Sequence, residues 1–205
     1  MKRVQFIPVI VSLLGIFLCV NNVNSELFNR GKDCKGNSMI YDSDLNVTWY
    51  DYTNPADTWQ NQMNWASGLT VEFGGTVFDD WRLPSTTDGP YIFGYDGTTT
   101  AGFNISDSDL GHLFYKEFGN QGAYDTSGSL TGCHSVLPSK CLTTTGPFAD
   151  LRTTRSYWTG AVHKEWRDAA WDFMFSNGRQ SAISMDYKKF AIAVRDGDVA
   201  ATPEQ

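Results

Sequence analysis

The sequence predicts an α+β fold in which two helices pack on a twisted antiparallel sheet. Strand-like segments occur near both ends of the chain, within residues 39–51 and 155–197. Two helical patterns lie between them, and a long loop-rich middle, rich in Gly, Ser and Thr, covers residues 121–147. Strands and helices that are grouped in this way, rather than alternating, are typical of α+β domains.

The first two predicted strands surround an acidic turn. Residues 39–41 and 47–50 are mostly apolar or aromatic, and the turn-forming letters "DSDLN" separate them. Asp42, Asp44 and Asn46 have the spacing that opens a calcium-binding loop, but the glycine and the closing acidic residue of such a loop are absent. We therefore interpret these side chains as an Asx-type turn.

Two helices are predicted, over residues 57–69 and 106–118. In each segment apolar residues recur at helical spacing, and a glycine follows as a stop signal. Short polar side chains at the start of each segment can accept hydrogen bonds from free backbone N–H groups. The candidate caps are Asp57 or Thr58 for the first helix and Ser106 or Asp107 for the second.

The stretch "VFDDWRLPS" is predicted to be extended and to end at its proline. Side chains alternate along an extended segment, so Trp81 and Leu83 face the core while Arg82 points the other way. We expect Arg82 to be a structural pin that pairs with loop carbonyls or with Asp79 or Asp80. The alternative is a contact between Arg82 and a ligand.

The last third of the chain is predicted to consist of strands. Residues 155–162 form the first, and residues 169–185 form a hairpin whose turn contains Asn177-Gly178, the strongest hairpin signal in the sequence. Residues 188–197 form the closing strand. Its nearly continuous apolar run predicts a central position in the sheet.

The N-terminal end has the pattern of a secretory signal peptide. Lys2 and Arg3 precede an apolar run over residues 7–20, and Ser25 stands at a suitable cleavage position. The apolar run is short for a bilayer span, which disfavours the alternative of an uncleaved anchor. We expect a mature protein that starts at Glu26 and is secreted, periplasmic or held at the cell surface.

The chain is predicted to hold one domain. After a signal peptide over residues 1–25, residues 26–38 are expected to be an N-terminal extension. The domain covers residues 39–199, and residues 200–205 form a disordered tail. A mature chain of 180 residues (205 − 25) is long enough to bury a core of ordinary size.

The mature chain is acidic. The signal segment carries two positive charges and no negative ones, so the remaining charge is 14 − 23 = −9. This balance argues against nucleic acid as a partner and against attraction to anionic membranes. Since no second long apolar segment occurs, no transmembrane segment is expected after cleavage. The sequence does not indicate an oligomeric state.

Three cysteines remain in the mature chain, and an exported protein is expected to form a disulfide. Cys133 and Cys141 flank a short loop and are the preferred pair. The sequence also allows Cys34 to pair with either of them. We expect the remaining thiol to be a buried or dispensable group rather than a reactive one.

One local cluster of cations and aromatics runs against the overall acidity. Arginine and aromatic side chains together suit sulfated or carboxylated sugars, because guanidinium pairs with the anion and a ring stacks on the sugar. The alternative, an ordinary solvated loop beside a buried Trp158, is the commoner arrangement. The candidate ligand-binding residues are Arg152, Arg155, Trp158, His163, Lys164, Trp166 and Arg167.

No catalytic residue, metal site or cofactor is predicted. His112, His134 and His163 have no metal-ligand spacing, except for His134 beside Cys133, and neighbouring side chains in an extended segment point apart. The sequence contains no nucleophile elbow, P-loop or zinc-protease motif. The structural residues that we single out are Trp81, Arg82, Cys133 and Cys141.

Eight segments taken in order resemble the Lcl C-terminal domain family, formerly a domain of unknown function. They are "MIYDSDLNVTWYD", "TWQNQMNWASGL", "DDWRLPS", "LGHLFYKEFGN", "GPFADL", "SYWTGAV", "AWDFMFSNGRQ" and "FAIAVRDGDV". The resemblance covers residues 39–199. It implies a C-type-lectin-like fold, related to that of the formylglycine-generating enzymes, in an exported bacterial binding module or adhesin.

The expected function is therefore a non-enzymatic module that binds carbohydrate or a surface polysaccharide. One alternative is an enzyme that resembles the formylglycine-generating group, although the paired active-site cysteines of that group have no clear counterpart here. Another is a structural matrix protein without a discrete ligand site. The collagen-like repeat of the best-known adhesins is also absent from this sequence.

Overall fold

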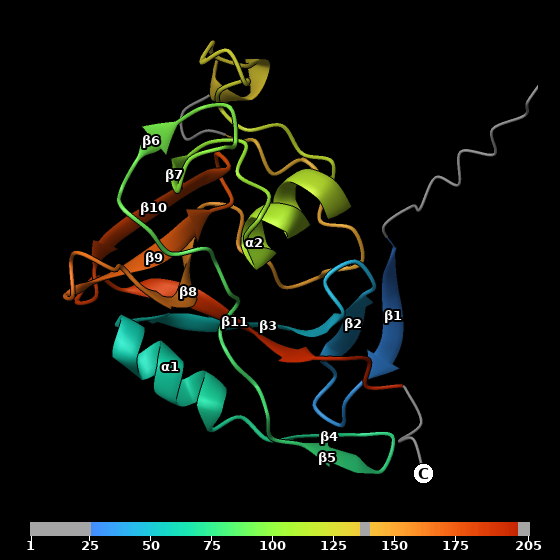
Figure 1. The fold of residues 1–205 in the computed structure, drawn as a ribbon. Helices are drawn as coiled ribbons and strands as arrows, with labels where there is room; N and C mark the ends of the chain where they lie inside the picture. Colours follow the sequence, from blue (N-terminus) through green and yellow to red (C-terminus); the bar gives the residue numbers. More distant parts are fainter. Residues whose placement is uncertain (1–25, 136–139, 201–205) are drawn as a thin grey trace, which may run out of the picture.

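The computed structural model describes residues 26–135 and 140–200, and most of its strands belong to one nine-stranded sheet (Figure 1). The order across the sheet is β1-β2-β3-β11-β8-β9-β10-β7-β6. The strands are β1 Leu27–Lys32, β2 Ser38–Asp42, β3 Val47–Asp57, β4 Val71–Phe73, β5 Thr76–Phe78, β6 Phe93–Gly94, β7 Ala101–Gly102, β8 Ser156–Val162, β9 Ala169–Met174, β10 Arg179–Ser184 and β11 Lys189–Asp196. The predicted signal peptide and residues 201–205 of the predicted tail lie outside the described residues.

The fold class is α+β, as predicted. The predicted hairpin forms as β9–β10, with Arg179 opposite Met174 and Asn177-Gly178 in the turn, and β11 has a central position in the sheet. The prediction that the last strands form an antiparallel sheet is wrong at β11. This strand pairs in parallel with β8, at Phe190 and Tyr157, and antiparallel with β3. Burial on both faces of the central strand accounts for its continuous apolar run.

Two helical segments cover opposite faces of the sheet (Figure 1). Helix α1, Trp59–Ser67, packs on β3, β8 and β11, and Thr58 is its N-cap with Gly68 at its C-terminal end. The other face is covered by the short helix α2, Asp109–His112, and the π-helical turn η1, Leu113–Glu117. A 3₁₀ turn, η2, spans Gly132–Ser135.

The second helix begins later than the sequence predicts. Its cap is Ser108, whose hydroxyl accepts a hydrogen bond from the N–H of Gly111 at 3.2 Å, in place of Ser106 or Asp107. A side chain at Gly111 would lie 2.2 Å from the carbonyl oxygen of Ile105, so only glycine lets the helix approach this segment so closely. Beyond His112 the helix widens into a π turn that a simple 3.6-residue pattern does not reveal.

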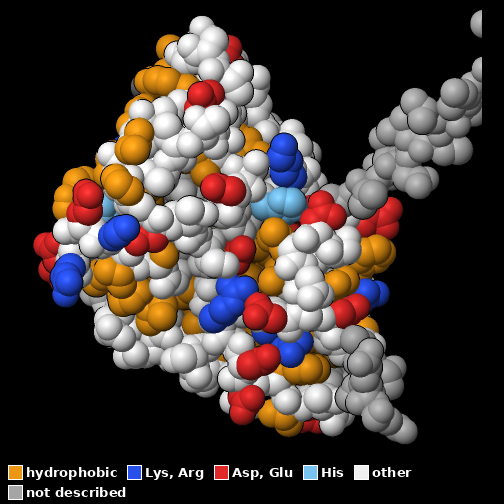
Figure 2. Space-filling view, viewed as in Figure 1, with side chains coloured by type: hydrophobic (Ala, Val, Ile, Leu, Met, Phe, Trp, Pro, Cys, Tyr) orange, Lys and Arg blue, Asp and Glu red, His pale blue; other side chains and the backbone are white. Residues whose placement is uncertain are grey.

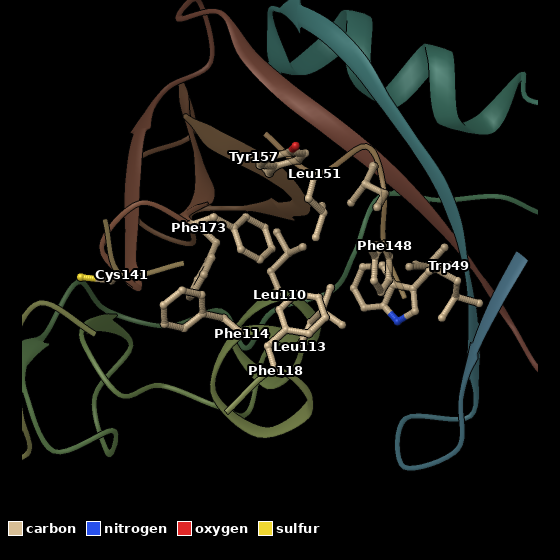
Figure 3. Packing of buried hydrophobic residues seen from close by; sticks show 14 of the residues in the cluster. Trp49, Leu110, Leu113, Phe114, Phe118, Cys141, Phe148, Leu151, Tyr157 and Phe173 are labelled. Atoms are coloured by element: carbon tan, nitrogen blue, oxygen red, sulfur yellow. The ribbon is translucent and has the colours of Figure 1, made fainter. Parts of the chain in front are cut away.

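The largest core cluster joins α2 and η1 to the sheet (Figure 3). Leu110, Leu113 and Phe114 point toward Phe173 of β9, and the rings of Phe114 and Phe173 lie 5.6 Å apart. Trp49 of β3 meets Phe148 edge-on at the other end of the cluster. Rings packed edge-to-face in this way contribute beyond the apolar area that they bury.

Three segments add strands that the sequence did not indicate. Strand β1 lies in the predicted N-terminal extension and pairs with β2, with a bulge between Asn29 and Gly31. Strands β4 and β5 form a small separate hairpin. The short β6 and β7 occur within a segment expected to be loop. Each of these strands is short or edge-placed, which weakens the alternating pattern that identifies a strand.

The preferred disulfide is present, and of the two alternatives for the third cysteine, a buried or a dispensable thiol, the buried one is wrong. Cys133 and Cys141 are joined within the loop-rich middle, and Cys141 is buried. Cys34 is a free and exposed thiol rather than a buried one. In the described part of the chain, no helix has the length and apolarity needed to cross a membrane.

An ion pair fastens the chain after β5 to the central strand. Arg195 donates two hydrogen bonds to the carboxylate of Asp80, at 2.8 and 3.0 Å, and its guanidinium lies 4.6 Å from the ring centre of Phe78. These hydrogen bonds hold the pKa of Asp80 below its ordinary value. The stabilisation is therefore complete above the unfolded-state pKa of about 4 and is lost as the pH falls through the lower folded-state value.

Asp80→Asn should lower the free energy of unfolding by about 0.5–1 kcal/mol at pH 7, since the carboxylate is half-exposed. The loss should be smaller in urea titrations at about pH 2 than at pH 7, because a lower pH moves the wild-type carboxyl toward protonation in the folded state as well as in the unfolded state. Asp79→Asn is the matched control, because Asp79 forms no ion pair within the described residues. An equal loss at both pH values would contradict this role.

Candidate functional site

The seven predicted ligand-binding residues do not form one surface. Arg152 and Arg155 precede β8, whereas Lys164, Trp166 and Arg167 lie in the loop between β8 and β9. A seven-residue strand is about 20 Å long, so β8 separates the two groups. Residues that are close in sequence are therefore divided between two ends of a strand.

Two of the seven are core residues. Trp158 and His163 have no exposed surface. The indole N–H of Trp158 donates to the carbonyl of Asp57 at 3.1 Å, and its ring packs in the cluster beneath α1. Neither side chain can contact a ligand at the surface, so direct binding by Trp158 and His163 is ruled out in this conformation.

Trp166 belongs to an exposed stack of rings that we name the aromatic ledge, formed by Tyr91 and Trp166 with His163 and Trp171 behind them. The rings of Trp166 and Tyr91 stack at 5.2 Å and 26°, and those of Trp166 and His163 stack at 4.4 Å and 13°. Trp166 is 46% exposed although two rings, those of Tyr91 and His163, hold its position. Figure 2 shows hydrophobic surface interspersed with charged side chains over this end of β8, β9 and β10.

His163 positions the loop that carries Trp166. Its Nδ1 accepts hydrogen bonds from the backbone N–H groups of Glu165, at 3.2 Å, and of Trp166, at 3.1 Å. A neutral ring that accepts at Nδ1 carries its proton on Nε2. The Nε2 group is buried and has no hydrogen-bond partner among the described residues. His163 thus acts through Trp166 and not on a ligand itself.

Polar groups border the aromatic ledge. Asp88 accepts hydrogen bonds from the indole N–H of Trp171, at 2.9 Å, and from the backbone N–H of Lys164, at 3.0 Å. Slight burial tends to raise the pKa of Asp88, but these hydrogen bonds outweigh it and leave the pKa below its ordinary value. Arg179 donates to the hydroxyl of Tyr91 at 3.2 Å. The ledge therefore combines an apolar face with a carboxylate and a guanidinium at its border.

A second candidate, which we name the cationic pocket, lies at the other end of β8. It is a cavity of about 470 Å³ lined by Ala56, Thr154, Arg155, Ser156, Met174, Lys188, Lys189 and Phe190. Lys189 is already engaged, because its ammonium lies 3.0 Å from the carboxylate of Asp172. Burial raises the pKa of Asp172, and the charge of Lys189 opposes this rise. Arg155 and Lys188 remain the groups that can meet an anion, since Lys188 is exposed and has only a long contact of 3.9 Å with the carboxylate of Asp57.

The sequence indicates Trp166 but not its neighbours. Tyr91 and Asp88 lie in the segment expected to be a plain loop, and they reach the ledge because β10 pairs with β7 at Gln180 and Gly102. The only sequence signal for this placement is a loop that is rich in aromatic residues, including the exposed Phe93. Nothing in a single sequence links that loop to the β8–β9 loop.

The structural residues lie as expected, with different partners for one of them. Trp81 and Leu83 are buried, and Arg82 points away from them. Its carboxylate partners are Asp109 and Asp196, in place of Asp79 or Asp80.

Comparison with known proteins identifies no relative, since no family model, curated protein or solved structure matches the chain. The resemblance to the Lcl C-terminal domain family stays a prediction.

Proposed function

We propose that this protein is an exported, non-enzymatic module that binds carbohydrate through the aromatic ledge. The observation that carries the proposal is the half-exposed ring of Trp166, held in place by the rings of Tyr91 and His163. An exposed aromatic side chain that is already ordered loses little entropy on binding. Its face suits the C–H face of a pyranose ring, and Asp88 and Arg179 can bind sugar hydroxyls at its border.

The first experiment is a glycan array of neutral, carboxylated and sulfated glycans, followed by affinity measurements on the best glycan. Trp166→Ala should weaken binding at least about ten-fold, which corresponds to about 1.4 kcal/mol. Trp166→Phe should restore part of the affinity, because it keeps a ring at this position. Stability should change little, since about half of the Trp166 surface is already exposed.

Phe28→Ala is the matched control for this variant. Phe28 is also a partly exposed aromatic residue that stacks on a neighbouring ring, but it lies on β1 at the opposite edge of the sheet. Its removal should leave glycan binding unchanged. A blank array at low salt, or equal binding by wild type and Trp166→Ala, would contradict the proposal.

The salt dependence distinguishes the aromatic ledge from the cationic pocket. Binding through stacked rings should depend weakly on ionic strength, whereas an anionic glycan in the cationic pocket should be released as charges are screened. Arg155→Ala would then reduce binding, and Arg152→Ala, whose guanidinium pairs with Asp150 at 3.1 Å, would not. If Arg155→Ala loses glycan binding and Trp166→Ala does not, the binding site is the cationic pocket rather than the aromatic ledge.

The alternative functions make different predictions. An enzyme of the formylglycine-generating type would use a reactive thiol, and the exposed Cys34 is the free thiol of the described chain. Activity abolished by Cys34→Ser would favour that alternative. A matrix protein would be retained in an extracellular polysaccharide without saturable affinity for any single glycan.

A further inference from the structure

The acidic turn after β2 lies against the helical segment formed by α2 and η1. Asp42 ends β2 and Asp44 lies in the turn, while His112 precedes the π turn η1 and Glu117 is its last residue. Potential ligand atoms of Asp42, His112 and Glu117 all lie within 4.8 Å of one another. The Nε2 of His112 lies 3.0 Å from a carboxylate oxygen of Glu117 and 3.9 Å from one of Asp44.

The π turn brings the histidine and the glutamate together. In an α-helix of 3.6 residues per turn, residues five apart point about 140° away from each other. Here the N–H of Phe118 donates to the carbonyl of Leu113 at 3.0 Å, an i→i+5 bond that widens the turn. This widening lets Glu117 reach back to His112. π turns of this kind occur frequently at functional sites.

Two carboxylates of the cluster are buried, and their charge is not balanced by protein groups among the described residues. Asp42 has no exposed surface and the Glu117 side chain is 2% exposed. Among the described residues, the cation within ion-pairing distance of these carboxylates is His112 alone. Even with His112 protonated, the two buried carboxylates leave −2 + 1 = −1, and the third carboxylate, of Asp44, is 34% exposed at the open side. Burying such an excess is costly without a further positive charge.

The backbone of the acidic turn binds one of the two carboxylate oxygens of Asp42. This oxygen, Oδ1, accepts hydrogen bonds from the backbone N–H groups of Asp44, at 3.2 Å, and Leu45, at 3.1 Å, so the predicted Asx turn is present. Within the described parts of the chain, Oδ2 has only a long contact of 3.4 Å with the indole N–H of Trp49. The Glu117 side chain makes a single hydrogen bond among the described residues, to His112. Carboxylate acceptor capacity thus remains unused inside the cluster.

We propose that Asp42, His112 and Glu117, with Asp44 at the open side, bind a divalent transition-metal ion such as Zn²⁺. One imidazole nitrogen and several carboxylate oxygens form a ligand set that suits Zn²⁺. Ligand atoms around a tetrahedral zinc ion lie about 3.3 Å apart, so small side-chain shifts open the 3.0 Å contact for an ion. The partly exposed Asp44 and His112 provide the route of entry.

The test uses the tag-free protein carrying Cys34→Ser, so that the free thiol cannot bind zinc. After chelation and dialysis, calorimetric titration with ZnCl₂ at pH 7 should give one site per chain. Glu117→Gln and His112→Gln should each raise the Kd for Zn²⁺ at least about ten-fold. Asp125→Asn, which alters an exposed Asx turn elsewhere, is the matched control and should bind like the parent.

A measurement on the otherwise unaltered protein guards against variants that fail to fold. Of the three histidine ring signals in the NMR spectrum, one should shift when Zn²⁺ is added and should cease to titrate with pH, because a zinc-bound nitrogen cannot take a proton. The proposal is overturned if no saturable Zn²⁺ binding occurs or if no histidine signal responds. Stronger binding of Ca²⁺ than of Zn²⁺ would also overturn it.

Discussion

Trp158→Ala should destabilise the protein by about 3–5 kcal/mol, as expected for removing a buried tryptophan from a core. The ring has no exposed surface, and it packs with Trp59, Leu83 and Ala191 in the cluster beneath α1. The substitution also removes the donor to the carbonyl of Asp57 and leaves that acceptor without its buried partner. The ammonium of Lys189, 5.5 Å from the ring centre, loses a favourable cation–π contact as well.

Urea unfolding followed by circular dichroism measures this loss, and Trp166→Ala is the natural comparison. Both are tryptophans of the predicted ligand-binding group, but Trp166 is about half exposed. Trp166→Ala should cost roughly 1 kcal/mol or less and should affect glycan binding instead. A stable Trp158→Ala variant that no longer binds glycan would contradict the core role of Trp158 and would favour a role in ligand binding.

Arg82→Ala should lower the free energy of unfolding by about 2–3 kcal/mol. Its guanidinium lies 2.7 Å from Asp196, the last residue of β11, and 3.2 Å from Asp109 at the start of α2. Partial burial lowers the pKa of Arg82, but the hydrogen bonds and charges of the two aspartates outweigh it and raise the pKa overall. Without the arginine, the mostly buried Asp109 keeps only its bonds from Ser85.

Arg82→Lys separates geometry from charge. A lysine keeps the charge but cannot span both aspartates with a planar fork, so most of the loss should remain. Arg167→Ala controls for the removal of an exposed arginine and should change thermal stability little. Arg82 also borders a surface hollow with Met63 and Gly160, which makes ligand contact the competing role. Intact stability with lost ligand binding would favour that role.

Local features of the fold were predictable because their causes are local. The cap at Thr58 and the Asn177-Gly178 turn each depend on residues that are neighbours in sequence. The alternation of Trp81, Arg82 and Leu83 likewise follows from the geometry of an extended segment. The start of α2 was missed, since the steric demand at Gly111 comes from a different segment.

Features that depend on distant segments were not predictable from one sequence. The partners of Arg82 are 27 and 114 residues away, and alternation fixes the direction of a side chain but not what meets it. The predicted binding cluster failed for a similar reason. Proximity in sequence along β8 was taken for proximity in space, and the side chain that completes the ledge, Tyr91, belongs to another loop. His112 and the acidic turn were each noticed, but nothing in the sequence joins them.

The pairing of β3 with β11 has a consequence for the order of folding. Val47 lies opposite Asp196, so the centre of the sheet joins residues from the two ends of the domain. Contacts of such high sequence separation require closing a long loop before they stabilise anything, which slows folding. Because the chain is synthesised from its N-terminus, it cannot complete this core until β11 has been synthesised and is free to pair. Fragments that lack β11 should therefore remain unfolded, and the domain should fold as one cooperative unit.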